Sequence, residues 1–349
     1  MLFSIYPTDT ADTRRAVIAQ AAAAPAAAGE RMLFTSLHMV DVAELAAFGD
    51  VLRDAHEAHG VTYCADVSPV ALEHVVAGAE GWGWLAHRGI TMLRLDYGFD
   101  PAEIGDVAQA SGCRIAVNAS TVDGAFLDAL AGLPLVGWHN FYPRPETGLT
   151  ASYLQSQSRL FDERGLPVVA FIPGEREFRA PLHLGLPTLE EHRYRNAWRT
   201  YLQLRRLVPE AAVACAEGAL ADDHAEWIAE FEAAGTVTLP VVGLDPAASV
   251  LLDRPWHLRV EEAATAFRLD DSRGGIRPSR IRNADRREQG SLQVDLDAYG
   301  RYRGEVHLMR TARPLDAGQA RIGDIAAPYR GILDDLRPGQ TVRFVRLAD

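Results

Sequence analysis

The amino-acid sequence predicts an α/β protein in two parts, a (β/α)8 TIM barrel at residues 1–235 and a small all-β domain at residues 236–349. In the first part, apolar runs of strand length alternate eight times with stretches of helical periodicity, the count expected for this barrel. After Gly235, short alternating segments between Gly, Pro and Asp clusters replace the helical pattern. A doubly wound open sheet is the alternative, but Tyr6-Pro7-Thr8-Asp9, after the first predicted strand, lacks the glycines typical of that fold.

Each apolar run of strand length predicts a strand, and each segment of helical periodicity predicts a helix. The predicted barrel strands are Leu2–Tyr6, Met32–His38, Val61–Asp66, Thr91–Asp96, Arg114–Asn118, Leu135–Asn140, Pro167–Ile172 and Ala211–Ala216. The predicted helices are Thr13–Ala24, Val42–His59, Ala71–His87, Pro101–Ser111, Gly124–Ala131, Ser152–Arg164, Leu189–Leu207 and Asp222–Ala234. The predicted strands of the second domain are Thr236–Val242, His257–Val260, Ser291–Asp295, Glu305–Met309 and Thr341–Leu347.

The segment Asp270–Gln289 stands out in the second domain because it is rich in arginine. With Arg268 just before it, its arginines are Arg273, Arg277, Arg280, Arg282, Arg286 and Arg287. A solvated loop is one interpretation of such a run. The other, which we adopt as a hypothesis, is a cationic segment that closes over the barrel mouth.

The composition argues against several classes of protein. The chain is 48% hydrophobic and 23% charged, and no apolar run is long enough to span a bilayer, so we expect no membrane partner. A formal net charge of −12 argues against nucleic acid as a partner. The three cysteines stand singly, which predicts no disulfide framework and favours a cytoplasmic location. The first residues predict a strand with no basic segment before it, so no signal peptide is expected.

Candidate functional residues stand at the C-terminal ends of the predicted strands, where this type of barrel carries its sites. Because side chains alternate along a strand, Arg94 and Asp96 share a face, and Leu93 and Leu95 point out to the helices. Arg94 and Asp96 are therefore expected inside the barrel, where a charge is costly unless it is partnered. The polar residues at the strand ends are Tyr6, Ser36, His38, Asp66, Asp96, Asn118, His139, Asn140 and Glu217.

Asp66 and Asp96 end neighbouring predicted strands, so strand spacing places them about 5 Å apart. Two carboxylates that close would have separated pKa values, as acid and base or acid and nucleophile require. Helix capping or pairing with Arg94 is the alternative for both. Glu175 and Glu217 are further carboxylates on the same rim, and the alternative for them is a solvated loop charge.

An anionic group of a substrate would fit the loops after the seventh and eighth strands, residues 172–179 and 216–220. Glycine backbone N–H groups and either Arg176 or Arg179 could hold a phosphate there. A metal site is disfavoured, because no HxH or HxxxH spacing links the histidines of the barrel. We therefore expect no metal ion and no organic cofactor.

Several motifs run in one order along nearly the whole chain. The motifs are Ser4–Pro7, Phe34–His38, Asp66–Pro69, Arg94–Phe99, Asn118–Ser120, His139–Leu149, Ala170–Gly174, Gly185–Arg193 and Arg301–Val306. The most specific is His139–Leu149, which reads HNFYPRPETGL. On these residues the chain resembles the 6-phospho-N-acetylmuramidase (MupG-type) family.

The resemblance implies a TIM barrel followed by a cyclophilin-like β domain. It also implies cytoplasmic hydrolysis of the β-1,4 bond in N-acetylmuramic acid 6-phosphate–N-acetylglucosamine, during recovery of cell-wall fragments. Such a reaction needs one carboxylic acid for the leaving oxygen and one carboxylate that attacks or activates water. Asp66 and Asp96 are the expected pair, with Glu175 and Glu217 as substitutes. The residues expected to bind this carbohydrate phosphate are Tyr6, Ser36, His38, Arg94, Asn118, His139, Asn140, Tyr142, Arg144, Arg176, Arg179 and Glu190.

Two stretches depart from the family pattern. Arg179-Ala180-Pro181 replaces Arg-Gly-Pro, and Glu217-Gly218 replaces a Gly-Asp pair. These departures keep open a sugar-phosphate binding protein without hydrolysis. A metal-dependent barrel isomerase or epimerase is a further alternative. A homodimer is likewise left open.

Overall fold

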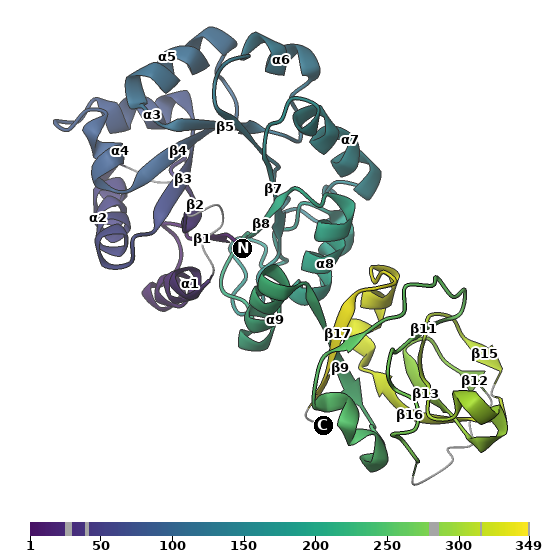
Figure 1. Cartoon of the computed structure of the whole chain (residues 1–349). Coiled ribbons are helices and arrows are strands. Elements are labelled where there is room, and N and C mark those ends of the chain that lie inside the picture. The colour runs from purple at the N-terminus through teal and green to yellow at the C-terminus, as the bar shows by residue number, and fades with distance from the viewer. Residues whose placement is uncertain (25–29, 39–41, 279–285, 315, 348–349) are drawn as a thin grey trace. The chain divides into compact units, whose positions relative to one another are not determined.

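The computed structural model describes residues 1–24, 30–38, 42–278, 286–314 and 316–347 (Figure 1). The chain forms two compact units, Met1–Ala225 and Glu226–Asp349. The sequence predicts a domain boundary after Gly235, and the compact units divide within helix α9 (Asp222–Ala234). Of the predicted cationic segment, Arg280 and Arg282 lie outside the described residues, and its closure over the barrel mouth stays a prediction.

The second half of α9 belongs to the second unit because its side chains pack there. The ring of Trp227 lies 5.8 Å from that of Tyr329, centroid to centroid, and Glu230 pairs with Arg343. Both partners are far along the chain, so the helical pattern of α9 alone gives no sign of the division.

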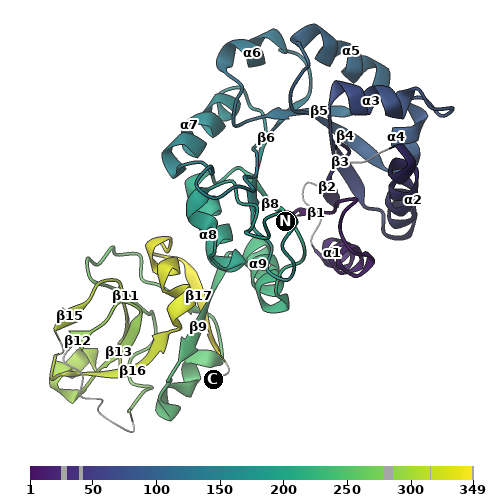
Figure 2. The same cartoon turned by 180° about the vertical axis from the view of Figure 1, so that it is seen from behind.

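The first unit is the predicted barrel. Its strands are all parallel and follow one another in chain order, and Leu2 bridges Ala214 to join the last strand to the first. Helices lie on the outside of these strands (Figures 1 and 2). The strands are β1 (Phe3–Ser4), β2 (Met32–Ser36), β3 (Thr62–Val67), β4 (Ile90–Leu95), β5 (Arg114–Asn118), β6 (Leu135–Trp138), β7 (Val168–Ile172) and β8 (Ala212–Cys215). The eightfold strand prediction is confirmed.

Helices begin where a short polar side chain caps the first turn, as with Thr10 and Ser68. The predicted helix Ala71–His87 is two helices, because the chain turns between them and Gly81 adopts φ 53°. The predicted helix Leu189–Leu207 is shortened to a 3-10 turn, η1 (Glu190–His192), and a helix that begins after Asn196. The helices are α1 (Ala11–Ala23), α2 (Val42–His59), α3 (Pro69–Val76), α4 (Gly83–His87), α5 (Pro101–Ser111), α6 (Gly124–Ala129), α7 (Ala151–Asp162), α8 (Ala197–Leu207) and α9. Every helix among the described residues is too short or too polar to span a bilayer.

Aromatic rings fill the middle of the barrel. Phe34 contacts Trp138 and Phe171 at ring centroid distances of 5.4 and 5.2 Å, and Phe141 lies 5.2 Å from Phe171. Arg94 is 3% exposed, in line with the predicted inward face. Above these apolar rings, polar side chains gather at the C-terminal ends of the strands, which is where this architecture places its chemistry.

The second unit is a mostly β domain, as predicted. Its seven-stranded sheet has the order β10-β17-β9-β16-β13-β14-β11, with only β9 and β17 parallel. The prediction missed β11 and β16, which are short or interrupted by Gly323 and charged residues. The strands are β9 (Thr236–Val242), β10 (Trp256–His257), β11 (Ala266–Arg268), β13 (Ser291–Asp295), β14 (Val306–Met309), β16 (Gln319–Ile325) and β17 (Thr341–Arg346), with β12 (Arg286–Arg287) and β15 (Arg313–Pro314) as a separate pair. The 3-10 helices are η2 (Pro246–Leu252), η3 (Asp297–Tyr302) and η4 (Ala327–Asp334).

Gly174, in the loop after β7, allows that loop to meet the one after β8. A Cβ at this position would clash with the backbone carbonyl oxygen of Glu217. We expect Gly174→Ala to lower the free energy of unfolding by about 1–3 kcal/mol, measured by chemical denaturation. Gly105→Ala is the matched control, because nothing lies near its Cβ position in α5, and it should raise that free energy by up to about 1 kcal/mol. Equal stability of the two variants would contradict the packing argument.

Candidate functional site

The centre of the barrel mouth is the guanidinium group of Arg94. Asp66 on β3 pairs in register with Arg94 on β4, and Arg94 Nη1 donates to Asp66 Oδ1 at 2.8 Å. Arg94 Nη2 lies 3.1 Å from Asp96 Oδ1 and also donates to the side-chain oxygen of Asn140. The predicted carboxylate pair is therefore bridged by Arg94, the alternative that the sequence left open.

Asp66 is held in its charged form by its neighbours. Burial acts to raise the pKa of its carboxyl, but Arg94 and the nearby ring of His38 bring that pKa below its ordinary value. His38 Nε2 lies 3.1 Å from Asp66 Oδ2. Asp66 is thus a carboxylate at neutral pH, which suits a nucleophile or a base rather than an acid.

Asp96 faces open space on one side. Asn118 Nδ2 donates to Asp96 Oδ1 at 2.8 Å. Both residues line a cleft of about 520 Å³ whose walls come from β4, β5, α5 and α6. Tyr97 lies in the same wall, is 66% exposed, and stacks on the His38 ring at 5.8 Å between centroids. An exposed ring of this kind can pack against a sugar, and sequence reasoning did not single it out.

His139 does not reach the mouth. It is fully buried, with Nδ1 3.1 Å from Ser120 Oγ and Nε2 3.1 Å from Ser158 Oγ. Burial and the charge of Arg94 lower the pKa of His139 to about 3, so its ring is neutral. Ser120 Oγ in turn accepts the backbone N–H of Asn140 at 3.0 Å. The predicted sugar contact is revised, because His139 positions Ser120 and Asn140 instead.

A second carboxyl group of the opposite character follows β8. Glu217 is 1% exposed, and its carboxylate accepts the backbone N–H of Arg179 at 2.6 Å. Burial raises the pKa of Glu217 to about 7. Asp9, which sequence reasoning missed, accepts the backbone N–H of Tyr6 at 2.7 Å, and burial raises its pKa to about 6. Glu217 can therefore carry a proton near neutral pH.

Tyr6 and Arg179 pack against each other. The Tyr6 hydroxyl donates to the carbonyl oxygen of Ala216 at 2.7 Å, and the side chain is fully buried. The guanidinium carbon of Arg179 lies 3.7 Å from the centre of the Tyr6 ring. This places Tyr6 in the wall of the barrel and ties the loop that carries Arg179 to β1.

Glu175 is occupied by structural partners. Its carboxylate accepts the backbone N–H groups of Ala197 at 2.9 Å and Ala221 at 3.0 Å, and it lies 2.8 Å from His224 Nδ1. Burial acts to raise the pKa of Glu175, but His224 and these N–H groups bring it below its ordinary value. Glu175 thus holds the starts of α8 and α9, which favours a structural role over the predicted catalytic one.

Glu190 also has a structural role. It binds Arg193 through both oxygens and accepts the backbone N–H of Gly148 at 2.9 Å. The hydrogen bond from Arg193 lowers the pKa of Glu190 to about 2. Arg193 continues the network to the carbonyl oxygen of Tyr142 at 2.9 Å. This pair fixes the HNFYPRPETGL loop, in which Tyr142 is half-buried and Arg144 is exposed.

The cavity at the loop after β7 measures about 270 Å³. Arg195 and His183 are its basic residues, whereas Arg176 pairs with Asp222 and Arg179 covers Tyr6. Arg195 Nη1 also lies 3.5 Å from Glu191 Oε2, and phosphate binding at this loop stays a prediction. Its lining residues are Pro173, Gly174, Glu175, Phe178, His183, Leu184, Gly185, Tyr194 and Arg195.

Two residues of this cavity hold a strained backbone. His183 and Tyr194 have φ values of 53° and 66°, a region that residues other than glycine rarely adopt. Such strain is often found where a ligand binds.

Ser36, the remaining predicted contact, is buried at the end of β2 beside Asp66. Within the described residues, no three His, Cys, Asp or Glu side chains are grouped as ligands for a metal ion.

Two sequence models of one family match this chain. The model described as "6-phospho-N-acetylmuramidase, N-terminal" matches residues 3–224, and "6-phospho-N-acetylmuramidase, C-terminal" matches residues 243–345. A search of curated proteins finds no match.

Two solved structures are similar over nearly the whole chain. One is a conserved protein of unknown function from a locus in Enterococcus faecalis, 24% identical, covering 99% of this chain and 96% of its own, with a TM-score of 0.82. The other is an uncharacterized B. cereus protein, 24% identical, covering 98% of each chain, with a TM-score of 0.76. At these identities the likeness shows the fold alone.

The raised pKa of Glu217 predicts a pH-dependent stability. Because folding raises this pKa from 4.5 to about 7, ionisation favours the unfolded chain, and stability is lost as pH rises through that window. The Gln side chain of Glu217→Gln cannot ionise. The unfolding free energy of this variant minus that of the parent should therefore grow by on the order of 2 kcal/mol from about pH 5 to about pH 8. Glu163→Gln, at an exposed position, controls for the loss of one charge in the same denaturation series. A constant difference for Glu217→Gln would contradict the burial argument.

Proposed function

The chain belongs to the 6-phospho-N-acetylmuramidase family, and from this premise we propose that it hydrolyses the β-1,4 bond of N-acetylmuramic acid 6-phosphate–N-acetylglucosamine. We place this reaction in the cytoplasm, in the recovery of cell-wall fragments. The observation that carries the proposal is a pair of carboxyl groups with opposed environments at one barrel mouth. Asp66 is held as an anion, and Glu217 keeps a proton to about pH 7.

The two groups divide the work of glycoside hydrolysis. Glu217 protonates the leaving oxygen of N-acetylglucosamine, and Asp66 attacks the sugar carbon or removes a proton from the attacking water. Asp96, the carboxylate first paired with Asp66, binds sugar hydroxyl groups from its place in the cleft beside Tyr97. Arg94 keeps Asp66 and Asp96 in fixed positions.

The phosphate of the substrate binds in the cavity after β7. Arg195 supplies charge and N–H donors there, and His183 supplies a ring nitrogen. A phosphate there would form a charge-assisted hydrogen bond with Arg195 that the unphosphorylated sugar cannot form, which would favour the phosphorylated sugar.

The catalytic assignment is tested with two substrates, the natural disaccharide and an aryl glycoside of the same phosphorylated sugar. Glu217→Gln should slow release of N-acetylglucosamine by about 10²–10⁴-fold, yet keep most activity on the aryl glycoside, whose leaving group needs no proton. Asp66→Asn should lose activity on both substrates. Mass spectrometry of the products gives the rates.

Several outcomes would contradict the assignment. A Glu217→Gln variant that loses both activities equally would remove Glu217 as the acid. Full turnover by Asp66→Asn would remove Asp66. If the parent protein binds the disaccharide but releases no N-acetylglucosamine, it is a binding protein rather than a hydrolase.

The phosphate cavity predicts a separate effect on affinity. Arg195→Gln should raise KM for the phosphorylated disaccharide by about 10- to 100-fold, as expected for one charge-assisted hydrogen bond, with kcat little changed. Arg176→Gln is the matched control, because Arg176 pairs with Asp222 outside this cavity. Both variants should act like the parent on the unphosphorylated disaccharide. A KM increase in Arg176→Gln alone would move the phosphate seat to that arginine.

A further inference from the structure

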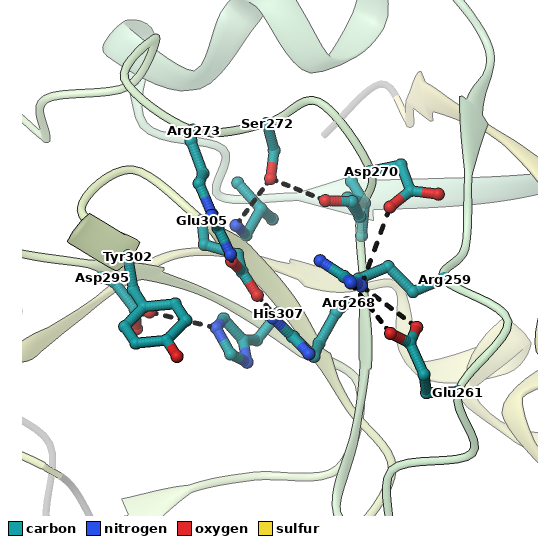
Figure 3. Close-up of polar contacts among 12 residues, drawn as sticks. Arg259, Glu261, Arg268, Asp270, Ser272, Arg273, Asp295, Tyr302, Glu305 and His307 are labelled. Carbon is teal, nitrogen blue, oxygen red and sulfur yellow. Dashed lines mark hydrogen bonds and ion pairs between the residues drawn. The ribbon is translucent and has the colours of Figure 1, made fainter. Parts of the chain in front are cut away.

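One face of the sheet in the second unit carries charged and amide side chains in a row. Arg268 on β11, His307 on β14 and Gln293 on β13 are paired in register, so they point to the same side of the sheet. Their neighbours along the strands, such as Phe267 and Leu308, are buried on the opposite side. Figure 3 shows the polar side of these strands.

Glu305 holds two arginines together on this face. It is 2% exposed, Arg268 Nε donates to its Oε1, and Arg273 Nε donates to its Oε2 at 2.7 Å (Figure 3). The Arg268 and Arg273 side chains stay 26% and 44% exposed. In the described part of the chain, Arg268 pairs with no other carboxylate. Two guanidinium groups bound to one carboxylate leave a net positive charge and outward N–H donors.

Tyr302 lies beside Arg273 and adds an aromatic face. The guanidinium carbons of Arg273 and Arg301 lie 5.0 and 4.8 Å from the centre of its ring. Arg301 Nη2 also donates to the Tyr302 hydroxyl at 2.7 Å. The surface here thus combines three cations with a half-buried ring.

Behind this surface lies a buried polar layer. Asp295, 4% exposed, accepts from Gln319 Nε2 at 2.6 Å and lies 3.3 Å from His307 Nε2. Gln293 is fully buried, and its Oε1 has no hydrogen-bond partner among the described residues. Burying such groups costs free energy, and apolar side chains would serve stability better. Each unsatisfied buried polar group in a native protein needs an explanation, and a ligand bound above this layer is one.

We propose that this face of the second unit is a binding site for a small molecule that carries an oxyanion, a phosphate or a carboxylate. The outward N–H groups of Arg268 and Arg273 hold the oxyanion, and Glu305 orients both guanidinium groups for it. A ring of the ligand packs on Tyr302. The site stands on residues of the second unit alone and does not depend on the reaction proposed for the barrel.

The test follows the His307 ring resonances by NMR in the full chain, because His307 is paired in register with Arg268. The probes are inorganic phosphate, lactate as a carboxylate, N-acetylglucosamine 6-phosphate and unphosphorylated N-acetylglucosamine. A saturable shift of the His307 signals with phosphate or lactate, and tighter binding of the sugar phosphate, are the expected results. The phosphate and lactate titrations distinguish the two kinds of oxyanion.

Three variants make the test specific. Arg273→Gln should abolish the saturable shift, and Arg273→Lys, which keeps a charge beside Glu305, should weaken binding about tenfold through loss of the planar fork. Arg337→Gln, at an exposed position of the same unit, should bind like the parent. Thermal unfolding confirms that each variant is folded.

The proposal is overturned if no probe gives a saturable shift in the parent, or if Arg273→Gln retains it. It is also overturned if Arg337→Gln loses the shift as fully as Arg273→Gln, because binding would then follow total charge rather than this face.

Discussion

The barrel mouth depends on one buried cation. Arg94 is 3% exposed at the end of β4, and a guanidinium group removed from water must find acceptors for its charge. It finds them in Asp66, Asp96 and Asn140. The same contacts keep Asp66 ionised despite its burial. The contacts that compensate for the burial of this one arginine therefore also set the position and charge of the residues around it.

The barrel could be predicted from the sequence because its signals are local. Apolar runs and helical periods repeat eight times, and side-chain alternation correctly turned Arg94 inward. The register between strands could not be predicted in this way. Nothing local shows that Asp66 pairs with Arg94 rather than with Asp96, since the stagger between parallel strands is set by packing over the whole barrel. The arginine bridge between the carboxylates was therefore visible only as an alternative.

The roles of polar residues in the loops are even harder to predict from local sequence. Glu175 looked as available as Glu217, but its partner His224 comes 49 residues later. Whether a loop carboxylate faces solvent, a ligand or another loop depends on such distant contacts. Asp9 and Arg195 were missed for the converse reason, because neither stands in an apolar strand or in a conspicuous motif. Sequence patterns indicated the polar residues at the strand ends, and long-range contacts decided which of them are held by the fold.

The two units use the same pairing of charges with opposite results. In the barrel, one buried guanidinium group stands between two carboxylates, so the group leaves a negative balance and keeps Asp66 available as an anion. In the second unit, the buried carboxylate of Glu305 stands between Arg268 and Arg273, and the balance is positive. A buried ion of one sign fixes exposed ions of the other sign, at the cost of its own desolvation. The fixed charges that result are the features on which both proposals rest, catalysis in the first unit and anion binding in the second.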